Sequence, residues 1–317
     1  MPVRADLADA TEPAQPIPWP HGHRAAAALT FDVDAESAVL SVRPTSARRL
    51  SVMSHQAYGP LTGVPRILRL LETYALRATF FVPGFTAERY PSTVERIAAA
   101  GHEVAHHSFL HESVQEMGPG AEAAMIDRGL EALDRVAGIT PLGYRAPLWE
   151  LSYRTIGLLA DRGFLYDSSM MDCDLPYELS EGPKPGARSV VEVPVHWSLD
   201  DWEQYAFVPE ITGSGLIESP AKVLEMWTAE LEAFHAHGLC FVLTNHPFLS
   251  GRPSRVAALE QLLERMTALG GMWVATVGEI AAHVRSLGLR PRVFPQPVVT
   301  GHPAEARRRG VHGSEED

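Results

Sequence analysis

The sequence predicts an α/β fold in which a mostly parallel sheet is covered by helices. Apolar runs of strand length alternate with segments of helical period through the middle of the chain. Glycine follows the predicted helices just before the next strand begins, and the strands themselves are almost continuously apolar. This pattern is typical of a barrel or of a doubly wound sheet. No G-x-G-x-x-G follows the first strand, which disfavours a dinucleotide-binding version.

Glycine marks where the predicted helices end, because it adopts the left-handed cap conformation at low cost. The predicted helices with a following glycine span residues 92–100, 152–162, 221–237 and 254–269. The predicted strands span residues 26–31, 78–82, 102–105, 143–145, 164–166, 190–195, 239–244 and 272–275.

The length and composition predict one globular domain with a tail at each end. The 317 residues are 45% apolar, which is enough for a packed core, and α/β barrels of roughly 200–250 residues fold as one unit. Residues 1–22 are rich in Ala, Pro and Asp, and residues 291–317 lack periodicity. We therefore expect a flexible N-terminal tail over 1–22, a single catalytic domain over 23–290 and a flexible C-terminal tail over 291–317.

Charge and cysteine content narrow the classes of partner and compartment. The net charge is −12 and the only dense basic run is Arg307 to Arg309, which disfavours nucleic acid and anionic membranes as partners. Two cysteines, Cys173 and Cys240, make neither a disulfide framework nor a multi-thiolate zinc site. With no readable signal peptide or membrane span, we expect a cytoplasmic protein.

Polar residues cluster where the predicted strands end, and this is the main functional signal. In a parallel barrel the carboxyl ends of the strands share one face, on which active sites are built. The polar residues at these ends are Asp32, Asp34, His106, His107, His111, Arg145, Asp167, His196 and His246. Packing alone does not explain their convergence.

Two histidines and two aspartates suggest a metal site. His107 and His111 are four residues apart, so a helical turn or tight loop brings both imidazoles to one side. With a carboxylate from Asp32 or Asp34 they would form an open site for zinc or another divalent metal. One aspartate would bind the cation while the other accepts a proton from water. Loop-capping aspartates and partly exposed histidines are the alternative interpretation.

Other strand-end residues suggest roles around such a site. The guanidinium of Arg145 is placed to orient a carboxylate, and His246 emerges from the most apolar strand as a candidate general acid. Trp149 and Trp197 are candidates for a ring platform, although core packing explains tryptophans equally well. Asp167 either supports His246 or caps a strand end.

Five motifs in order resemble the polysaccharide deacetylases, which contain the NodB homology domain. The resemblance covers about residues 26–283. The motifs are Thr30-Phe-Asp-Val-Asp34, Arg77-Ala-Thr-Phe-Phe-Val-Pro83, Gly101-His-Glu-Val-Ala-His-His-Ser-Phe-Leu-His111, Arg145-Ala-Pro147 and Leu243-Thr-Asn-His246.

The resemblance implies a distorted (β/α) barrel and a metal-dependent hydrolase of non-peptide C–N bonds. It implies that Asp34, His107 and His111 bind a divalent metal, zinc first and Co²⁺, Ni²⁺ or Mn²⁺ as alternatives. Asp32 is then the base that deprotonates the metal-activated water, and Arg145 positions this base. His246 is the acid that protonates the departing nitrogen.

Departures from the family's usual motifs bear on the substrate. Val33 separates the two aspartates, Leu148 and Trp149 follow the third motif, and Glu112 replaces a proline after the second metal histidine. These variants resemble a branch identified as peptidoglycan deacetylases, which also contains cyclic-imide hydrolases and is similar to allantoinases. That branch implies a homo-oligomer, which an added loop such as residues 41–60 would serve.

Several functions therefore remain open. The first is deacetylation of an N-acetylglucosamine-type glycan or small amide, and the second is ring opening of a cyclic imide or ureide, favoured by bulky Trp149 and Phe248. The low-ranked substrate-contact residues are Trp149, Asp167, Trp197 and Phe248. A silent carbohydrate-binding barrel would need a broken metal triad, and an iron oxygenase would need a β-sandwich barrel.

Overall fold

The computed structural model describes residues 16–115, 117–209 and 216–297, so most of both expected tails lies outside the described residues. The strands are β1 (Ala25–Asp32), β2 (Thr79–Val82), β3 (Glu103–His106), β4 (Gly143–Tyr144), β5 (Tyr166–Asp167), β6 (Tyr177–Ser180), β7 (Ser189–Glu192), β8 (Cys240–Asn245), β9 (Met272–Val274) and β10 (Arg292–Val293). The helices are α1 (Ser37–Val42), α2 (Leu50–Tyr58), α3 (Val64–Thr73), α4 (Gly84–Arg89), α5 (Pro91–Ala99), α6 (Pro119–Ala137), α7 (Thr155–Asp161), α8 (Asp201–Tyr205), α9 (Pro220–His237), α10 (Pro247–Ser250), α11 (Pro253–Ala268) and α12 (Val277–Ser286).

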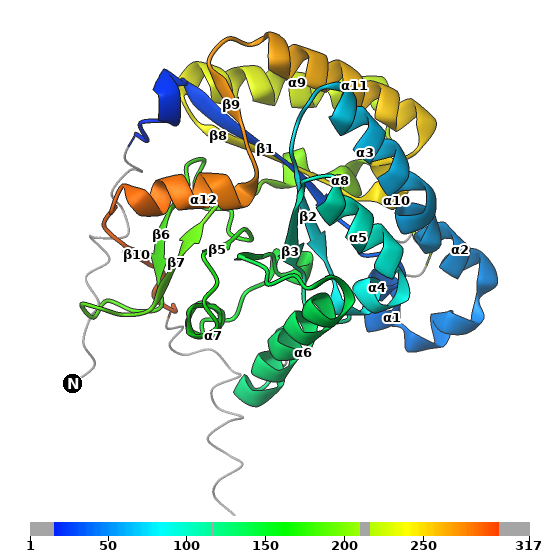
Figure 1. Ribbon diagram of the computed structural model, residues 1–317, viewed down its shortest axis with the longest axis horizontal. Coiled ribbons are helices and arrows are strands. Elements are labelled where there is room, and N and C mark those ends of the chain that lie inside the picture. Colours follow the sequence, from blue (N-terminus) through cyan, green and yellow to red (C-terminus); the bar gives the residue numbers. More distant parts are fainter. Residues whose placement is uncertain (1–15, 116, 210–215, 298–317) are drawn as a thin grey trace, which may run out of the picture.

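The strands form one curved sheet in the order β10-β6-β7-β5-β4-β3-β2-β1-β8, with β9 also paired to β1. All pairs are parallel except β6 with β7, which is antiparallel. A parallel bridge between Asp200 and Thr244 connects the segment after β7 to β8. This bridge brings the two halves of the sheet together at the carboxyl end (Figure 1). The arrangement is the expected distorted barrel.

Strand β1 is the centre of the fold, and its alternation sets the direction of the functional residues. Ala25, Ala27, Leu29 and Phe31 belong to the core beneath the outer helices, whereas Ala26 and Ala28 belong to the core inside the barrel. Successive strand side chains point to opposite faces, so Asp32 continues the inner row. The short residues of β1 leave room inside the barrel for the larger side chains of β2, β5 and β7.

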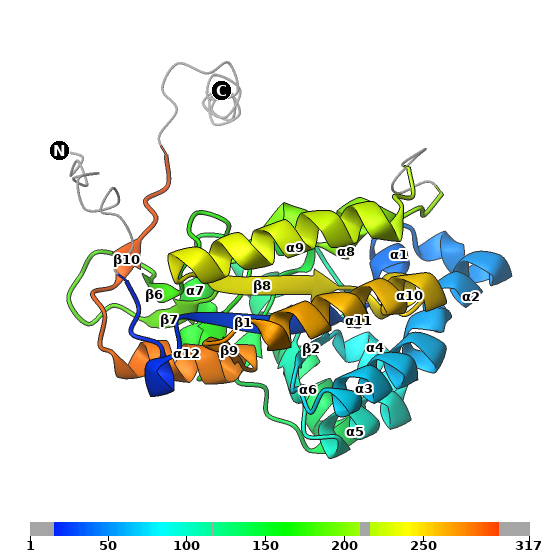
Figure 2. The ribbon, with the colours of Figure 1, turned by 90° about the horizontal axis from the view of Figure 1, so that it is seen from above.

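Helices cover the outside of the sheet and one helix covers its amino end. Figure 2 shows α9 and α11 running beside β8 and β1, with α3 and α5 along the same side. Helix α12 packs under the barrel, and its first turn has a capping box between Thr276 and Glu279. A capping box satisfies two backbone N–H groups that the start of a helix leaves unpaired.

The predicted strands and helices occur with boundaries shifted by a few residues, but several elements were not predicted. Helices α1 to α4, α6 and α12 and strands β6 and β10 have no counterpart among the predicted elements. Both tail boundaries are also wrong. Ile17 and Trp19 are buried, at 6% and 5% exposure, in the core inside the barrel, and β10 pairs with β6. The ordered part therefore begins before residue 23 and continues beyond residue 290.

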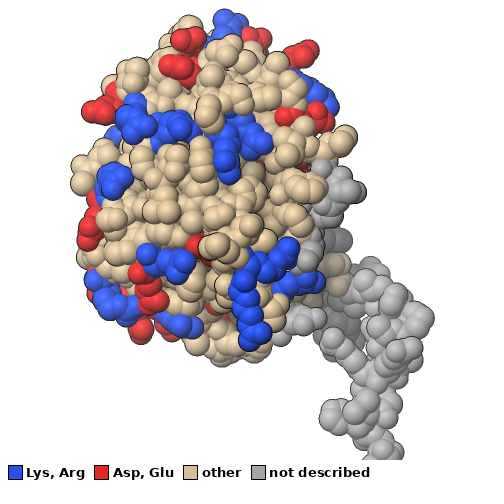
Figure 3. Space-filling model, turned by 90° about the vertical axis from the view of Figure 1, so that its right-hand side faces the viewer, with Lys and Arg blue, Asp and Glu red and all other residues tan. Residues whose placement is uncertain are grey.

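The surface charge is uneven. On the face in Figure 3, Lys and Arg side chains gather in separate groups with a broad uncharged band between them. The net charge of −12 is therefore not spread evenly over the molecule. Within the described residues, no helix is long and apolar enough to cross a membrane.

Candidate active site

A cavity of about 100 Å³ opens at the carboxyl end of the barrel, where the sequence predicts the site. It brings together residues from six separate segments of the chain. The lining residues are Asp32, Asp34, His107, His111, Leu148, Trp149, Trp197, Asp200, Trp202, Glu203 and His246. All but four of them carry an acidic or imidazole group, so the cavity combines proton-transferring and metal-binding side chains.

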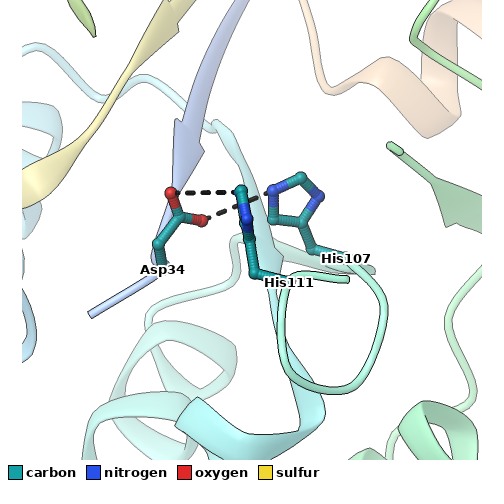
Figure 4. A group of neighbouring side chains, drawn as sticks. All are labelled: Asp34, His107 and His111. Carbon is teal, nitrogen blue, oxygen red and sulfur yellow. Dashed lines mark ion pairs between the residues drawn. The ribbon is translucent and has the colours of Figure 1, made fainter. Parts of the chain in front are cut away.

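Asp34, His107 and His111 converge at the base of this cavity (Figure 4). The Nε2 atom of His107 lies 3.4 Å from Oδ1 of Asp34, and Nε2 of His111 lies 3.6 Å from Oδ2. One ligand atom from each residue lies within 4.8 Å of the other two, and all three side chains are buried. These are the three residues that the sequence selected as metal ligands.

The backbone around the two histidines explains how four residues of chain bring both rings to one point. Ser108 and His111 have φ values of 60° and 59°, so the chain turns tightly after β3. A positive φ is unfavourable for these residue types and costs on the order of 1–3 kcal/mol. The Nδ1–H of His107 donates to the carbonyl oxygen of Arg145 at 2.7 Å, which leaves its Nε2 lone pair directed at Asp34.

The donor set fits a divalent metal. Neither carboxylate oxygen of Asp34 has a hydrogen-bond partner, although both are buried. Burial opposes the charge of Asp34, but His111 and His107 outweigh it and lower the pKa of this carboxyl. Burial lowers the pKa of His111 to about 4, so its imidazole is neutral and able to ligate. An ionised carboxylate with two imidazoles is a common open site for zinc.

Asp32 and Arg145 form the second part of the site. The Arg145 guanidinium is completely buried and donates from Nη1 to Oδ1 of Asp32 at 2.8 Å and to the hydroxyl of Thr30 at 2.9 Å. Its Nε and Nη2 donate to the backbone and side-chain oxygens of Ser168, and its guanidinium carbon lies 4.1 Å from the centre of the Phe81 ring. This packing fixes the Arg145 fork and, through it, the Asp32 carboxylate.

His246 lies on the opposite wall and is held by Asp201. The Nδ1–H of His246 donates to Oδ1 of Asp201 at 2.7 Å, and its backbone N–H donates to the same oxygen at 2.8 Å. Both the backbone N–H and the hydroxyl of Ser250 donate to Oδ2 of Asp201. The Nε2 atom of His246 then points into the cavity, 3.6 Å from Oδ2 of Asp34.

Acidic neighbours keep His246 protonated in this structure. Burial alone would lower the pKa of its imidazole, but Asp200, Asp201 and Asp34 outweigh burial and raise this pKa to about 10. Burial raises the pKa of the Asp200 carboxyl to about 7, despite the opposing effect of His246. A protonated imidazole whose other nitrogen is anchored is suited to donate a proton.

Aromatic side chains form the rim of the cavity. The rings of Trp149 and Trp197 stack with centroids 4.3 Å apart, and Trp202 contacts the ring of His246 edge-on at 5.2 Å. Leu148 and Trp149 have φ values of 57° and 54°, which costs on the order of 1–3 kcal/mol for each residue. The third motif departs from the family pattern at these two residues, and their left-handed backbone directs both side chains into the cavity wall.

Two of the predicted substrate-contact residues do not line the cavity. Phe248 is buried behind the wall and contacts His55, Trp202 and His246. Asp167 is completely buried in β5, and its carboxyl shares a hydrogen bond with Glu192 of β7. Asp167 therefore does not support His246. The other proposed residues, Trp149 and Trp197, do line the cavity.

Sequence reasoning did not select Asp201, which supports His246. A signal was available, because Asp200 and Asp201 follow the predicted strand over 190–195, as Asp32 and Asp34 follow the first strand. The segment between strand and aspartates is longer in the second case, so the aspartates were not assigned to the mouth. The short turn of residues 197–199 and the bridge from Asp200 to Thr244 carry them there.

Comparisons with known proteins agree on one family. The family model of polysaccharide deacetylase matches residues 22–166. A peptidoglycan deacetylase of Helicobacter pylori is 32% identical over 241 residues, which cover 69% of this chain and 82% of the relative. A peptidoglycan deacetylase-like protein of Gibberella zeae is 27% identical over 286 residues, covering 80% and 85%.

Solved structures agree with this result. The crystal structure of a Mycobacterium smegmatis protein classed with the polysaccharide deacetylases is 53% identical, with a TM-score of 0.88, covering 91% of this chain and 99% of that one. An allantoinase crystal structure has a TM-score of 0.76 at 23% identity, covering 90% and 98%. This second likeness concerns the fold.

Proposed function

The chain belongs to the polysaccharide deacetylase family, and from this membership we propose that it removes the acetyl group from an N-acetylated amino sugar of a glycan. The family consists of hydrolases that act on C–N bonds other than peptide bonds. The observation that carries the proposal is the convergence of Asp32, Asp34, His107, His111 and His246 in one cavity. This set contains a metal-binding triad, a base and an acid.

We infer that Asp34, His107 and His111 hold a divalent metal, zinc by the character of the donor set, with Co²⁺, Ni²⁺ or Mn²⁺ as alternatives. When bound, such an ion polarises the amide carbonyl and makes water acidic enough to ionise near neutral pH. The unpartnered oxygens of Asp34 and the anchored ring of His107 support this assignment. An intact triad also speaks against a silent carbohydrate-binding barrel.

Asp32 is the proposed base. Its carboxylate accepts the proton of the attacking water, while Arg145 keeps the carboxylate oriented toward the cavity and favours its ionised form. Oδ1 of Asp32 accepts from Arg145, so Oδ2 is the oxygen that remains to take the proton. The buried guanidinium also prevents the carboxylate from rotating toward the metal ligands.

His246 is the proposed acid. Its Nε2–H donates the proton to the departing nitrogen, and Asp201 holds the ring so that Nε2 faces the cavity. The proton count closes: water supplies one proton to Asp32 and its oxygen to the acetyl group, and the amine leaves with the proton of His246. Return of a proton from Asp32 to His246 through solvent completes the cycle.

One observation favours a second candidate function. The catalytic cavity, at about 100 Å³, is small and is flanked by stacked Trp149 and Trp197. A compact ring with an internal amide would fit such a space, so ring-opening hydrolysis of a cyclic imide or ureide is the alternative. The same residues would act on the ring amide without releasing an acid.

Mass spectrometry of products distinguishes the two functions. Zinc-loaded protein is incubated with N-acetylglucosamine oligomers, cyclic imides and ureides, and the His107→Ala variant serves as the control. We expect loss of an acetyl group from the sugars with the native chain only. Gain of one water by a cyclic compound would replace the proposal with the second candidate, and absence of any product would contradict both.

A further inference from the structure

A second cavity of about 370 Å³ adjoins the catalytic cavity. His111, Leu148 and Trp202 belong to the walls of both cavities, so they are continuous with each other. The remaining walls come from α1 and from the segment after the second metal histidine. These additional lining residues are Ala38, Ser41, Val42, Glu112 and Ser113.

The sizes of the two cavities indicate a division of the substrate between them. Ligand sites usually measure roughly 300–1,000 Å³. The catalytic cavity, at about 100 Å³, is below this range, whereas the second cavity falls within it. The catalytic cavity therefore suits the acyl-amide group, and the bulk of a larger substrate has to extend past Leu148 and Trp202.

The walls of the second cavity suit an uncharged hydroxylated ring. Val42 and Leu148, 62% and 53% exposed, form an apolar rim for the C–H face of a ring. The Glu112 carboxylate is fixed by the backbone N–H of Leu110, which donates to Oε2 at 2.7 Å. Its Oε1 forms no hydrogen bond to any described residue, so it is left to accept from a ligand hydroxyl.

The charges around both cavities disfavour an anionic occupant. Neither wall contains lysine or arginine among the residues described, while Glu112 and Glu203 add negative charge at the mouth. A carboxylate placed beside Glu112 would be repelled at short range. Glu112 also stands where the family pattern has a proline, so this charge belongs to the present chain.

We propose that the second cavity is a subsite for the neighbouring sugar ring, and that Glu112 selects a neutral, hydroxylated ring over one that carries a carboxylate. The inference rests on the proposed glycan deacetylation and adds to it the preferred substrate, a chain of at least two neutral amino sugars. Substrate length and ring charge then become properties of the α1 side of the mouth.

The test compares chain-length dependence in matched variants. The substrates are N-acetylglucosamine, its β-1,4-linked dimer, and a disaccharide whose second ring carries a carboxylate. Val42→Trp fills the rim of the second cavity, and Leu50→Trp, at an 84% exposed residue outside both cavities, is the matched control. Glu112→Gln removes only the charge.

We expect kcat/KM of the native chain to rise by about tenfold from monomer to dimer, which corresponds to ~1.4 kcal/mol of added binding. Val42→Trp should bring the dimer-to-monomer ratio close to one, while Leu50→Trp keeps the native ratio. Glu112→Gln should narrow the difference between the neutral and the carboxylate disaccharide by about tenfold. An unchanged ratio in Val42→Trp, or unchanged discrimination in Glu112→Gln, would overturn the proposal.

Direct binding separates failure of this inference from failure of the proposed function. Calorimetric titration of the dimer into Asp32→Asn, with and without Val42→Trp, reports on the subsite without turnover. We expect the added tryptophan to weaken binding by about tenfold. If no acetate is released from any sugar but this difference is present, the subsite stands and the deacetylase function fails. If acetate is released but the difference is absent, the subsite is wrong.

Discussion

At the level of single residues, the orientation of His246 depends on Asp201. Asp201 is completely buried and binds the imidazole, the backbone N–H of His246 and both polar groups of Ser250. The position of the catalytic imidazole is thus coupled to the start of α10. A carboxylate that holds a catalytic histidine typically fixes both its tautomer and its direction.

We predict that Asp201→Asn lowers kcat by about 10²–10⁴-fold while KM changes little, because proton donation depends on His246 and substrate binding does not. Steady-state kinetics with a glycan substrate measures both constants. Ser250→Ala removes only the support on the far oxygen and should lose much less. A large rise in KM with normal kcat in Asp201→Asn would contradict the positioning role.

A second pair of acids lies deeper, in the sheet behind Arg145. Asp167 and Glu192 face each other across β5 and β7, and each has one buried oxygen without a conventional partner. Burial raises the pKa of Asp167 to about 6 and that of Glu192 well above its usual value. The two carboxyls therefore share a proton, which is why neither serves the catalytic cavity.

This pair predicts a pH-dependent stability difference. Folding raises the pKa of Asp167, so between about pH 4 and pH 6 the folded chain keeps a proton that the unfolded chain has lost, and stability falls as pH rises. Asp167→Asn removes this proton uptake. Its free energy of unfolding, relative to the native chain, should improve by about 1.4 kcal/mol per pH unit over that window.

Urea unfolding of both proteins at about pH 5 and about pH 7 checks this expectation. Burial also lowers the pKa of His106 to about 3, which makes the stability of the native chain rise with pH over part of the same window. The difference between variant and native chain cancels this effect. An equal difference at both pH values would show that Asp167 is ionised in the folded state.

At the scale of elements, the contact between α10 and the turn η4 (Gly59–Gly63) depends on two glycines. A Cβ atom on Gly63 would lie 2.1 Å from the carbonyl oxygen of Pro247, and one on Gly251 would lie 2.4 Å from Cα of Gly63. The backbones therefore touch directly, next to His246. This contact connects the segment between α1 and α3 to the catalytic wall.

Gly63→Ala should destabilise the protein by about 1–3 kcal/mol, because the added methyl group forces η4 away from α10. It should also lower kcat, since α10 begins immediately after His246. Gly120→Ala in α6 is the control: nothing lies within 4 Å of its Cβ, and alanine favours helix by up to ~1 kcal/mol. Equal unfolding curves for Gly63→Ala and the native chain would show that η4 yields freely.

At the scale of the whole molecule, the sequence predicts the elements whose signal is local. The helix-ending glycines and apolar strands located most of the parallel sheet, and the strand-end rule brought Asp32, Asp34, His107, His111, Arg145 and His246 to one mouth. Both the fold class and the family are confirmed. The homo-oligomer, the single-domain boundaries and the metal remain predictions.

The features that the sequence did not predict depend on contacts between distant segments. Strands β6 and β10 are short and pair at the edge of the sheet, so their residues carry little periodic signal. The first ordered residues were assigned to a tail because Pro and Asp surround them, yet Trp19 packs against Trp273 and His283. The inward direction of Asp201 follows from the bridge between Asp200 and Thr244.

The account's central claim is that metal binding and proton abstraction belong to different residues of one cavity. Metal content and acetate release, measured together on Asp32→Asn and His107→Ala, test it most directly. We predict that Asp32→Asn retains about one divalent metal per chain but loses turnover by about 10²–10⁴-fold, whereas His107→Ala loses the metal. Near-native turnover in Asp32→Asn, or a full metal complement in His107→Ala, would contradict the claim.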